Sequence, residues 1–474
     1  MIENELWKAG DAAAATGGRA WGDWSATGVS IDTRSLVAGD LFIALQGPVH
    51  DGHSFLEKAY GAGAVAAMVH RAPEGALAER PHLLVDDTLG ALWRLGAASR
   101  SRTKAKVVAV TGSAGKTSTK EALKHCLAAQ ASVCANVGSL NNHWGVPLSL
   151  ARMSPSVTFG VFELGMNNPG EILELARLVR PHVGIITNVE AAHIGNFSSL
   201  EAIANAKAEV FQAIEPGGTA VLNRDNALYD YLTEKAKAAG IEHIVSFGWN
   251  DDADARVLST KRHSEGSVVD AEIMGQKLKF DLSLPGQHMI LNSLAVLSAI
   301  FLVGGNLEKA AAALGKLPSL SGRGVRQKIE FPGGSFLLID DSYNANPASM
   351  RASFDVLAHC TLPEGARRIA ILGDMLELGD DSQRLHRELA GPLKDTGAKV
   401  YCCGTDMAAL FSALPNSQRV LHTPDSQSMA ALVGNDVRPG DVVLVKGSLG
   451  SRMKIVVEAL QALGQPIAKA ANGS

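Results

Sequence analysis

Several features are scarce in this chain of 474 residues. Charged residues make up 19% and the net charge is −4, which excludes a disordered charged tail and gives nucleic acid no basic surface to bind. The five cysteines form no C-x-x-C pair, as expected of reduced thiols. No apolar run approaches the ~20 residues that span a bilayer. The longest, 289–303, is interrupted by Asn292, Ser293 and Ser298. Residues 1–5 lack the basic start of a signal peptide, so a cytoplasmic location is expected.

Apolar residues are abundant by comparison, at 46% of the chain, which is enough for several hydrophobic cores. Domains usually hold roughly 100–200 residues, so the length predicts two to four of them. Strand and helix patterns alternate from end to end, which indicates an α/β fold with largely parallel sheets. A basic stretch at 100–104 and a Pro/Gly/Ser cluster at 317–322 are the expected linkers. They divide the chain into domains at 1–100, 101–320 and 321–474.

Short apolar runs give the expected strands of each segment. The first segment has strands at 41–45 and 65–69, and the last has them at 336–339, 369–372, 400–403 and 442–445. Repeated strand and helix patterns in the last segment are typical of a doubly wound domain.

A glycine-rich loop follows the apolar run 107–110 and precedes a helix pattern that contains Ala122 and Leu123. This order of strand, loop and helix suits a phosphate cradle, because glycines let backbone N–H groups close on an anion at a helix N-terminus. The spacing G-x-x-G-K-T is two residues shorter than the general pattern. Lys116 is expected to meet the β/γ phosphates of ATP and Thr117 the Mg²⁺. The ATP-binding loop comprises Thr111, Gly112, Ser113, Ala114, Gly115, Lys116 and Thr117.

Lys207 lies on the apolar side of an expected helix. Ser198 and Glu201 fit a capping box, and the apolar stripe that follows is Leu200, Ile203, Val210, Phe211 and Ile214. The residues three and four away from Lys207 carry no carboxylate. Either the amine reaches water along the helix surface, or a group from elsewhere satisfies or modifies it.

Two further residues lie where α/β sheets bind ligands, after the carboxyl ends of strands. Glu163 ends the run 157–162, and His193 lies in the loop after the run 183–187. Both are possible Mg²⁺ ligands, although this ion prefers oxygen and His193 is the less expected of the two. A solvated strand end and an ordinary loop histidine are the alternatives.

Taken together, these motifs resemble the Mur ligase family, ATP-dependent amide ligases of peptidoglycan precursor synthesis. The loop T-G-S-A-G-K-T has that family's shortened form, and Glu163, His193 and Lys207 match its metal-site positions. The resemblance implies that Lys207 is carbamylated and so becomes an anionic Mg²⁺ ligand beside Thr117. It implies catalytic roles for Lys116, Lys207, His193 and Glu163, and it assigns Asn292, Arg323 and Asp341 to the adenine, the phosphates and the ribose.

The resemblance also implies an architecture and a pair of substrates. It predicts a small N-terminal α/β domain for the UDP end, a central P-loop-type domain with a mostly parallel sheet for ATP and Mg²⁺, and a C-terminal Rossmann-like doubly wound domain. Segments 141–147, 342–350 and 372–379 favour the members that add D-alanyl-D-alanine to UDP-N-acetylmuramoyl-tripeptide. The expected substrate-binding residues are Ser30, Asp32, Arg34, Asn141, Asn142, Tyr343, Asn344 and Asn346.

Other functions stay open at this point. A folylpolyglutamate synthase-like ligase would share the central fold, although the uridine-type N-terminal segment speaks against it. A P-loop ATPase without a small-molecule acceptor would leave segment 342–350 unexplained. A silent binding module would more readily have lost Lys116, Glu163 or Lys207. A monomer that binds no nucleic acid and spans no membrane is expected.

Overall fold

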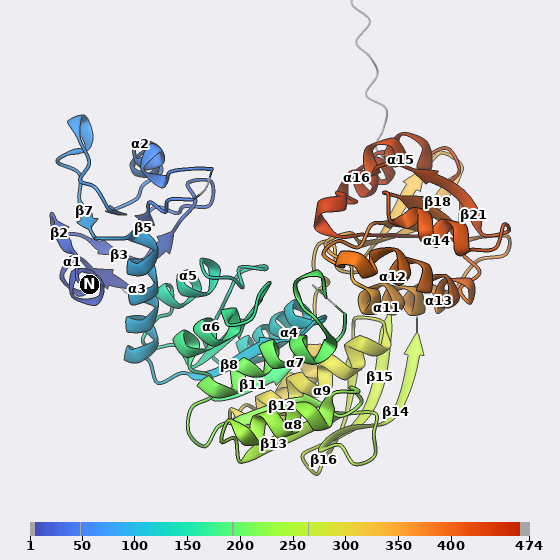
Figure 1. The fold of residues 1–474 in the computed structure, drawn as a ribbon, viewed down its shortest axis with the longest axis horizontal. Coiled ribbons are helices and arrows are strands. Elements are labelled where there is room, and N and C mark those ends of the chain that lie inside the picture. Colours follow the sequence, from blue (N-terminus) through green and yellow to red (C-terminus); the bar gives the residue numbers. More distant parts are fainter. Residues whose placement is uncertain (1–4, 48, 192–193, 264, 465–474) are drawn as a thin grey trace, which may run out of the picture.

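The computed structural model describes residues 5–47, 49–191, 194–263 and 265–464. An N-terminal part with two sheets, a central part and a C-terminal part follow one another along the chain in an arc (Figure 1). Each part combines parallel strands with covering helices, which confirms the predicted three-domain α/β architecture. The domain boundaries themselves stay a prediction.

The N-terminal part holds a two-stranded antiparallel sheet and a five-stranded sheet in the order β2-β7-β6-β5-β4. Its strands are β1 (Trp7–Lys8), β2 (Arg19–Trp21), β3 (Ser25–Ala26), β4 (Gly28–Ser30), β5 (Asp40–Ile43), β6 (Ala66–Val69) and β7 (His82–Leu84). Its helices are α1 (Ala9–Thr16), α2 (Leu56–Gly61) and α3 (Thr88–Arg102). The expected strands at 41–45 and 65–69 are β5 and β6.

Helix α3 runs into the stretch that was expected to be the first linker. The Asp87 carboxylate starts the helix by accepting from the N–H groups of Leu89 and Gly90. Arg100, in the last turns, is buried and donates to the carbonyls of Val179 and Arg180 in the central part. The prediction of a linker at 100–104 is therefore wrong for residues 100–102, because they form the end of α3 and the side chains of Arg100 and Arg102 donate to backbone carbonyls of the central and N-terminal parts.

The central part is built on a nine-stranded sheet in the order β16-β15-β14-β13-β12-β11-β8-β10-β9. Pairing is parallel from β9 to β14, and the last two strands add an antiparallel extension. The strands are β8 (Lys106–Thr111), β9 (Val133–Ala135), β10 (Phe159–Glu163), β11 (Val183–Ile186), β12 (Thr219–Asn223), β13 (His243–Gly248), β14 (Ala255–His263), β15 (Gly266–Ile273) and β16 (Gln276–Leu282). The helices are α4 (Lys116–Ala128), α5 (Gly145–Ala151), α6 (Glu171–Val179), α7 (Leu200–Ala208), α8 (Tyr229–Ala238), α9 (Gln287–Leu302) and α10 (Leu307–Leu314).

Helix α7 differs in detail from its prediction. Ser199, not Ser198, is the N-cap, because its hydroxyl accepts from the N–H of Ala202. Leu200 is 39% exposed and does not belong to the buried stripe. The helix ends at Ala208 and continues as a 3₁₀ turn over Glu209–Ala213, so the apolar stripe extends beyond the α-helix.

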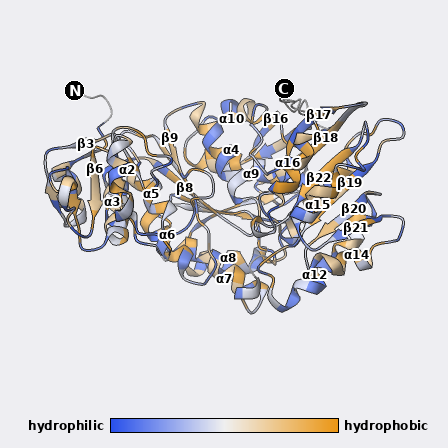
Figure 2. Ribbon diagram, turned by 90° about the horizontal axis from the view of Figure 1, so that it is seen from above, coloured by the Kyte–Doolittle hydropathy of each residue, from blue (hydrophilic) through white to orange (hydrophobic). Residues whose placement is uncertain are grey.

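The C-terminal part contains a six-stranded sheet in the order β17-β18-β22-β19-β20-β21. Strand β22 lies between β18 and β19, as a doubly wound topology requires, and Figure 2 shows the apolar strands of this sheet between their covering helices. Antiparallel β17 was not predicted. The strands are β17 (Val325–Phe331), β18 (Gly334–Asp341), β19 (Arg368–Gly373), β20 (Lys399–Cys403), β21 (Arg419–Thr423) and β22 (Val442–Lys446). The helices are α11 (Pro347–Ala358), α12 (Ser382–Glu388), α13 (Ala390–Lys394), α14 (Met407–Ala413), α15 (Ser426–Val433) and α16 (Lys454–Ala462).

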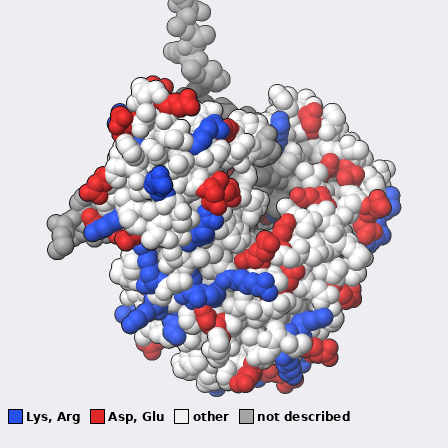
Figure 3. All heavy atoms as spheres, turned by 60° about the vertical axis from the view of Figure 1, so that its left-hand side comes forward, with Lys and Arg blue, Asp and Glu red and all other residues white. Residues whose placement is uncertain are grey.

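The surface carries charge of both signs, in keeping with the small net charge. Figure 3 shows acidic and basic side chains interspersed over one face, with a band of Lys and Arg at the lower left. Among the helices of the described residues, none has the length and apolar character needed to cross a bilayer.

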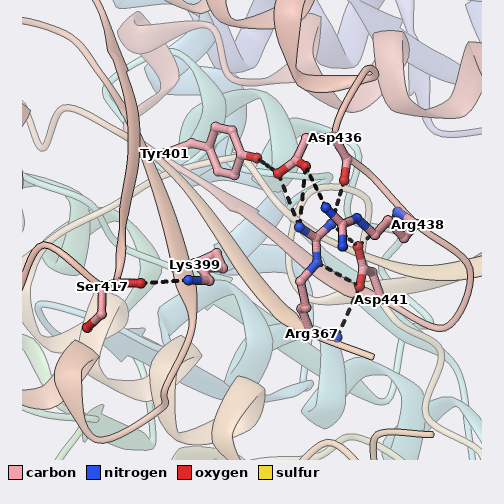
Figure 4. Close-up of polar contacts among 7 residues, drawn as sticks. All are labelled: Arg367, Lys399, Tyr401, Ser417, Asp436, Arg438 and Asp441. Atoms are coloured by element: carbon pink, nitrogen blue, oxygen red, sulfur yellow. Dashed lines mark hydrogen bonds and ion pairs between the residues drawn. The ribbon is translucent and has the colours of Figure 1, made fainter. Parts of the chain in front are cut away.

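A buried ion-pair network ties the amino ends of β19 and β22 together (Figure 4). The Arg367 guanidinium donates to Asp441, whose side chain is 1% exposed, at 2.7 Å, and it also pairs with Asp436 at 3.2 Å. The same Asp441 carboxylate accepts from the backbone N–H groups of Arg367 and Arg438. The Tyr401 hydroxyl donates to Asp436 from the neighbouring strand β20.

Substituting Arg367→Met should lower the free energy of unfolding of the C-terminal part by about 3 kcal/mol, because it leaves the buried Asp441 carboxylate unpaired. Lys399→Met is the control, since its ammonium makes a single exposed bond to the Ser417 carbonyl and its loss should cost less than about 1 kcal/mol. Hydrogen exchange of β19 and β22 in increasing urea measures both. Equal losses of unfolding free energy in the two variants would show that the ion-pair network adds no more stability than one exposed hydrogen bond.

Candidate active site

The glycine loop lies between β8 and α4, as the sequence predicts. Two of its positions can be occupied only by glycine. Gly112 has a φ of +146°, and a Cβ built there would come within 1.9 Å of the Thr187 hydroxyl. Gly115 has a φ of +80°, and its Cβ would come within 2.9 Å of the Asn292 amide nitrogen. Only glycine permits both the backbone conformation and these close approaches.

Side chains that follow β11 hold the loop in place. The Thr187 hydroxyl donates to the Ala114 carbonyl at 2.6 Å, and the Asn188 amide oxygen accepts from the Ala114 N–H at 2.8 Å. The Ser113 hydroxyl donates to the Glu190 carbonyl at 2.9 Å. A loop fixed in this way presents its own N–H groups, and the first N–H groups of α4, to an anion.

Lys116 opens helix α4, and its ammonium donates to the Gly112 carbonyl at 2.7 Å. Burial lowers the pKa of Lys116, the nearby Glu163 carboxylate opposes this shift, and the Arg323 charge adds to it. Among the described residues, Glu163 is the one carboxylate that acts on the Lys116 ammonium, so a phosphate in the loop would compete with few other anions for this cation.

Glu163 occupies the carboxyl end of β10, the strand next to β8, and it is 1% exposed. Its Oε1 accepts from the Asn141 amide at 2.7 Å. Its buried Oε2 has no hydrogen-bond partner among the described residues. An unpaired buried carboxylate oxygen is costly, so this atom is suited to a cation that binds from the cleft.

Lys207 is one of the largest fully buried side chains, at 2% exposure, which rules out the interpretation in which the amine reaches water. No carboxylate of the described residues lies within ion-pair distance of its ammonium. Burial lowers its pKa well below the usual value, and the charge of Lys116 lowers it further. The surroundings of Lys207 therefore disfavour the ammonium form of this side chain.

The C-terminal part forms the opposite wall of the site. Asp341, the last residue of β18, accepts from the Lys446 ammonium at 2.7 Å and from the Ser353 hydroxyl at 2.5 Å. Arg323 stacks on the Tyr343 ring with 4.3 Å between the guanidinium carbon and the ring centroid.

Asn346 joins the two walls directly. Its carboxamide caps helix α11 by accepting from the Ser349 N–H, and it donates to the Ser113 carbonyl of the glycine loop at 3.3 Å. A residue expected to bind substrate therefore also connects the C-terminal part to the phosphate loop.

The two walls enclose a cleft of about 580 Å³. Most of the predicted site residues line it, namely Ser113, Ala114, Gly115, Lys116, Thr117, Asn141, Asn142, Glu163, Asn292, Arg323, Asp341, Tyr343, Asn344 and Asn346. Thr111, Gly112 and Lys207 are not among the residues that line the cleft, and His193 falls outside the described residues.

The three N-terminal residues predicted to bind substrate are not part of the cleft lining. Ser30 is buried, and its hydroxyl bonds to the backbone of Asp32. Asp32 and Arg34 form an ion pair at 2.6 Å, and the hydrogen bonds from Arg34 lower the pKa of that carboxyl. Arg34 is 83% exposed, so its guanidinium is accessible at the surface of the N-terminal part.

Several residues around the cleft were missed by sequence reasoning. Asn188 and Lys446 stand at the carboxyl ends of β11 and β22, so the strand-end rule that found Glu163 could have found them. His288 lines the cleft from the start of α9, and Lys120 lies buried one turn after Lys116, where an apolar residue would be usual. Neither has a sequence pattern that would have singled it out.

Replacing Gly112 by alanine should abolish detectable ADP binding, with a loss of at least a hundredfold, because the new methyl group collides with Thr187 and strains the backbone. Gly10→Ala in α1 is the control, since a Cβ there meets nothing within 4 Å. Calorimetric titration with ADP measures both. Unchanged affinity in Gly112→Ala would contradict the loop's assignment to phosphate.

Comparison with known proteins identifies relatives for every part of this arrangement. A model described as the Mur ligase family, catalytic domain, matches residues 25–100. The Mur ligase middle domain matches residues 110–300, and the Mur ligase, glutamate ligase domain matches residues 327–449.

Two curated relatives carry the name UDP-N-acetylmuramoyl-tripeptide--D-alanyl-D-alanine ligase. The Escherichia coli protein is 35% identical over 441 residues, covering 92% of this chain and 94% of its own. The Rickettsia prowazekii protein is 33% identical over 435 residues, covering 91% and 95%. A crystal structure of MurF from Acinetobacter baumannii superimposes with a TM-score of 0.83 at 29% identity and covers 96% of this chain and 99% of its own. The likeness runs through all three parts of the molecule, and the chain belongs to the Mur ligase family.

Proposed function

We propose that this protein is an ATP-dependent amide ligase that joins D-alanyl-D-alanine to UDP-N-acetylmuramoyl-tripeptide. The tripeptide carboxylate attacks the γ-phosphorus of ATP, which gives an acyl phosphate and releases ADP. The amine of D-alanyl-D-alanine then attacks the acyl carbon and loses a proton, and phosphate leaves. The product is the pentapeptide precursor of peptidoglycan.

One observation supports this proposal more strongly than any other. The glycine loop, a buried strand-end carboxylate and polar side chains of the C-terminal part line one cleft within a chain whose relatives of that name match it almost end to end. A nucleotide held by the loop would have its terminal phosphate directed toward the C-terminal wall, where a second substrate can meet it.

Charge development determines what the site residues do. Every reacting group is anionic or becomes so, so catalysis depends on positioned cations and dipoles instead of a protein nucleophile. Lys116 would exchange its bond with the Gly112 carbonyl for one with the phosphates. The N-terminus of α4 adds its partial positive charge at the same point.

Mg²⁺ is the metal that this reaction requires, and the donor set fits it. Glu163 Oε2 is a buried anionic oxygen without a partner among the described residues, and Thr117 lines the same cleft. Mg²⁺ would shield the phosphate charge and favour attack at phosphorus. We propose Thr117, Glu163, His193 and a carbamylated Lys207 as the residues that hold it.

Carbamylation would resolve the position of Lys207. A neutral amine adds to CO₂ and releases one proton, which replaces an unpaired ammonium by an anion. Burial and the charge of Lys116 favour the neutral amine that this reaction needs. A carbamate would then be stabilised by the same Lys116 charge that disfavours the ammonium.

Contacts between the central and C-terminal parts support a closed, water-excluding site. Besides the bond from Asn346 to Ser113, the Gly195 N–H donates to the Glu377 carbonyl at 3.1 Å, and Arg351 approaches Glu190 at 3.6 Å. Closure protects an acyl phosphate from hydrolysis. Because one chain supplies all these groups, we propose that it acts as a monomer, and its five free thiols support a cytoplasmic location.

The remaining roles follow the position of each residue. We propose that Asn292, Arg323 and Asp341 contact the adenine, the phosphates and the ribose, because all three line the cleft around the loop. Asn141, Asn142, Tyr343, Asn344 and Asn346 would meet the peptide and the incoming dipeptide. Ser30, Asp32 and Arg34 would bind the uridine nucleotide in the N-terminal part, at the far end of the long substrate.

Phosphate release from Mg-ATP tests the proposed function. Steady release should require both UDP-N-acetylmuramoyl-tripeptide and D-alanyl-D-alanine, because the acyl phosphate forms only on the first and is consumed only by the second. Omitting either substrate should lower the steady rate at least a hundredfold. Release that ignores both would favour an ATPase, and release with a folate and glutamate would favour a folylpolyglutamate synthase-like enzyme.

A further inference from the structure

Lys120 is a buried cation that the proposed chemistry does not use. It lies on α4 one turn after Lys116, and its side chain is completely buried. Its ammonium donates to the carbonyls of Asn136 and Gly138, each at 2.9 Å, and pairs with the Glu121 carboxylate. All three donor positions of the ammonium are therefore occupied.

The two carbonyls belong to a segment that surrounds Glu163, residues 136–141, called here the 136–141 segment. Asn136 is fully buried, and its carboxamide accepts from the Glu163 N–H at 2.9 Å and donates to the Glu163 carbonyl at 3.0 Å. Asn141, at the other end, donates to the Glu163 carboxylate at 2.7 Å. The segment therefore fixes both the backbone and the side chain of Glu163.

The 136–141 segment has little regular structure of its own. Strand β9 ends at Ala135, and Gly138 has a φ of +55°. The carbonyls of Asn136 and Gly138 point inward to one cation, so the course of the segment depends on that charge. Without it, the buried carbonyl of Asn136, the part-buried carbonyl of Gly138 and the Glu121 carboxylate would lose their shared donor.

We propose that Lys120 is a positioning residue that sets the Glu163 carboxylate for its cation through the 136–141 segment. The inference rests on the metal role given to Glu163 under the proposed function. Lys120 touches neither substrate nor metal in this arrangement; it orders the segment, and Asn141 of that segment orients Oε1 so that Oε2 is left free. Replacing the ammonium should therefore weaken cation binding more than nucleotide binding.

Mn²⁺ binding in the presence of ADP, followed by the electron paramagnetic resonance signal of free Mn²⁺, tests this inference without turnover. Lys120→Met, which leaves an unbranched side chain one atom shorter and removes the charge, should bind Mn²⁺ at least tenfold more weakly. Lys124→Met is the matched control. Lys124 is on the same helix and approaches the same Glu121 at 3.7 Å, but it is 45% exposed and bonds to no residue of the 136–141 segment. Its Mn²⁺ affinity should stay within twofold of wild type.

Asn141→Ala keeps the inference testable even where Lys120→Met fails to fold. It removes the hydrogen bond between the segment and the Glu163 carboxylate, so in the absence of the peptide substrates it should reproduce the loss of Mn²⁺ affinity with little change in thermal stability. The Mn²⁺ affinity of the double variant should be no lower than that of the single variant that binds Mn²⁺ more weakly, because both substitutions act through the Glu163 carboxylate. Mn²⁺ binding within twofold of wild type in either single variant would overturn the role of Lys120.

Glu163→Gln separates this inference from the proposed function. If Glu163→Gln binds Mn²⁺ as tightly as the wild-type protein, Glu163 is not part of a metal site, and the role of Lys120 is overturned with it. Binding that is lost in Glu163→Gln but kept in Lys120→Met would overturn the role of Lys120 alone.

Discussion

The cleft depends on two buried groups for which the described residues provide no counterpart, the amine of Lys207 and the second carboxylate oxygen of Glu163. Lys116 interacts electrostatically with Glu163, Arg323 and Lys207, so charged groups of both signs lie close together at the cleft. Unpaired buried charge costs several kcal/mol, so a site of this kind is stable only where groups lose their charge or where ligands complete it. Burial lowers the pKa of Lys207 well below its usual value, and the glycine loop presents N–H groups to an anion. The anionic substrates of the proposed reaction supply what the protein lacks.

The fold explains how these groups reach one place. Parallel strands bring their carboxyl ends to the same edge, so the glycine loop after β8, Glu163 of β10 and Asn188 after β11 become neighbours on one sheet. The C-terminal sheet presents Asp341 of β18 and Lys446 of β22 in the same manner. Asn346 then joins the two edges through Ser113. Two strand-end edges facing each other provide one place for the nucleotide and one for its acceptor.

Much of this arrangement could be predicted, because strands and glycine loops have local sequence patterns. Residues close in the chain determine the glycine loop, strand β8, the position of Glu163 and the side of α7 on which Lys207 lies. The position of Arg100 could not be predicted, since its partners lie about 80 residues away. Nor could Lys120 or the bond from Asn346 to the loop, because burial and long-range contact determine them. The N-cap at Ser199 was missed because two adjacent serines give nearly the same local signal.

The state of Lys207 is the most direct test of this account. Enzyme equilibrated with ¹³CO₂ can be observed by ¹³C NMR, with Lys207→Met as the comparison. The account predicts one carbamate resonance in the wild-type protein that is absent from the variant, since a neutral amine beside Lys116 should capture CO₂ and become an anion. A fully active wild-type enzyme without that resonance would contradict it, and the buried amine would then need another source of charge balance.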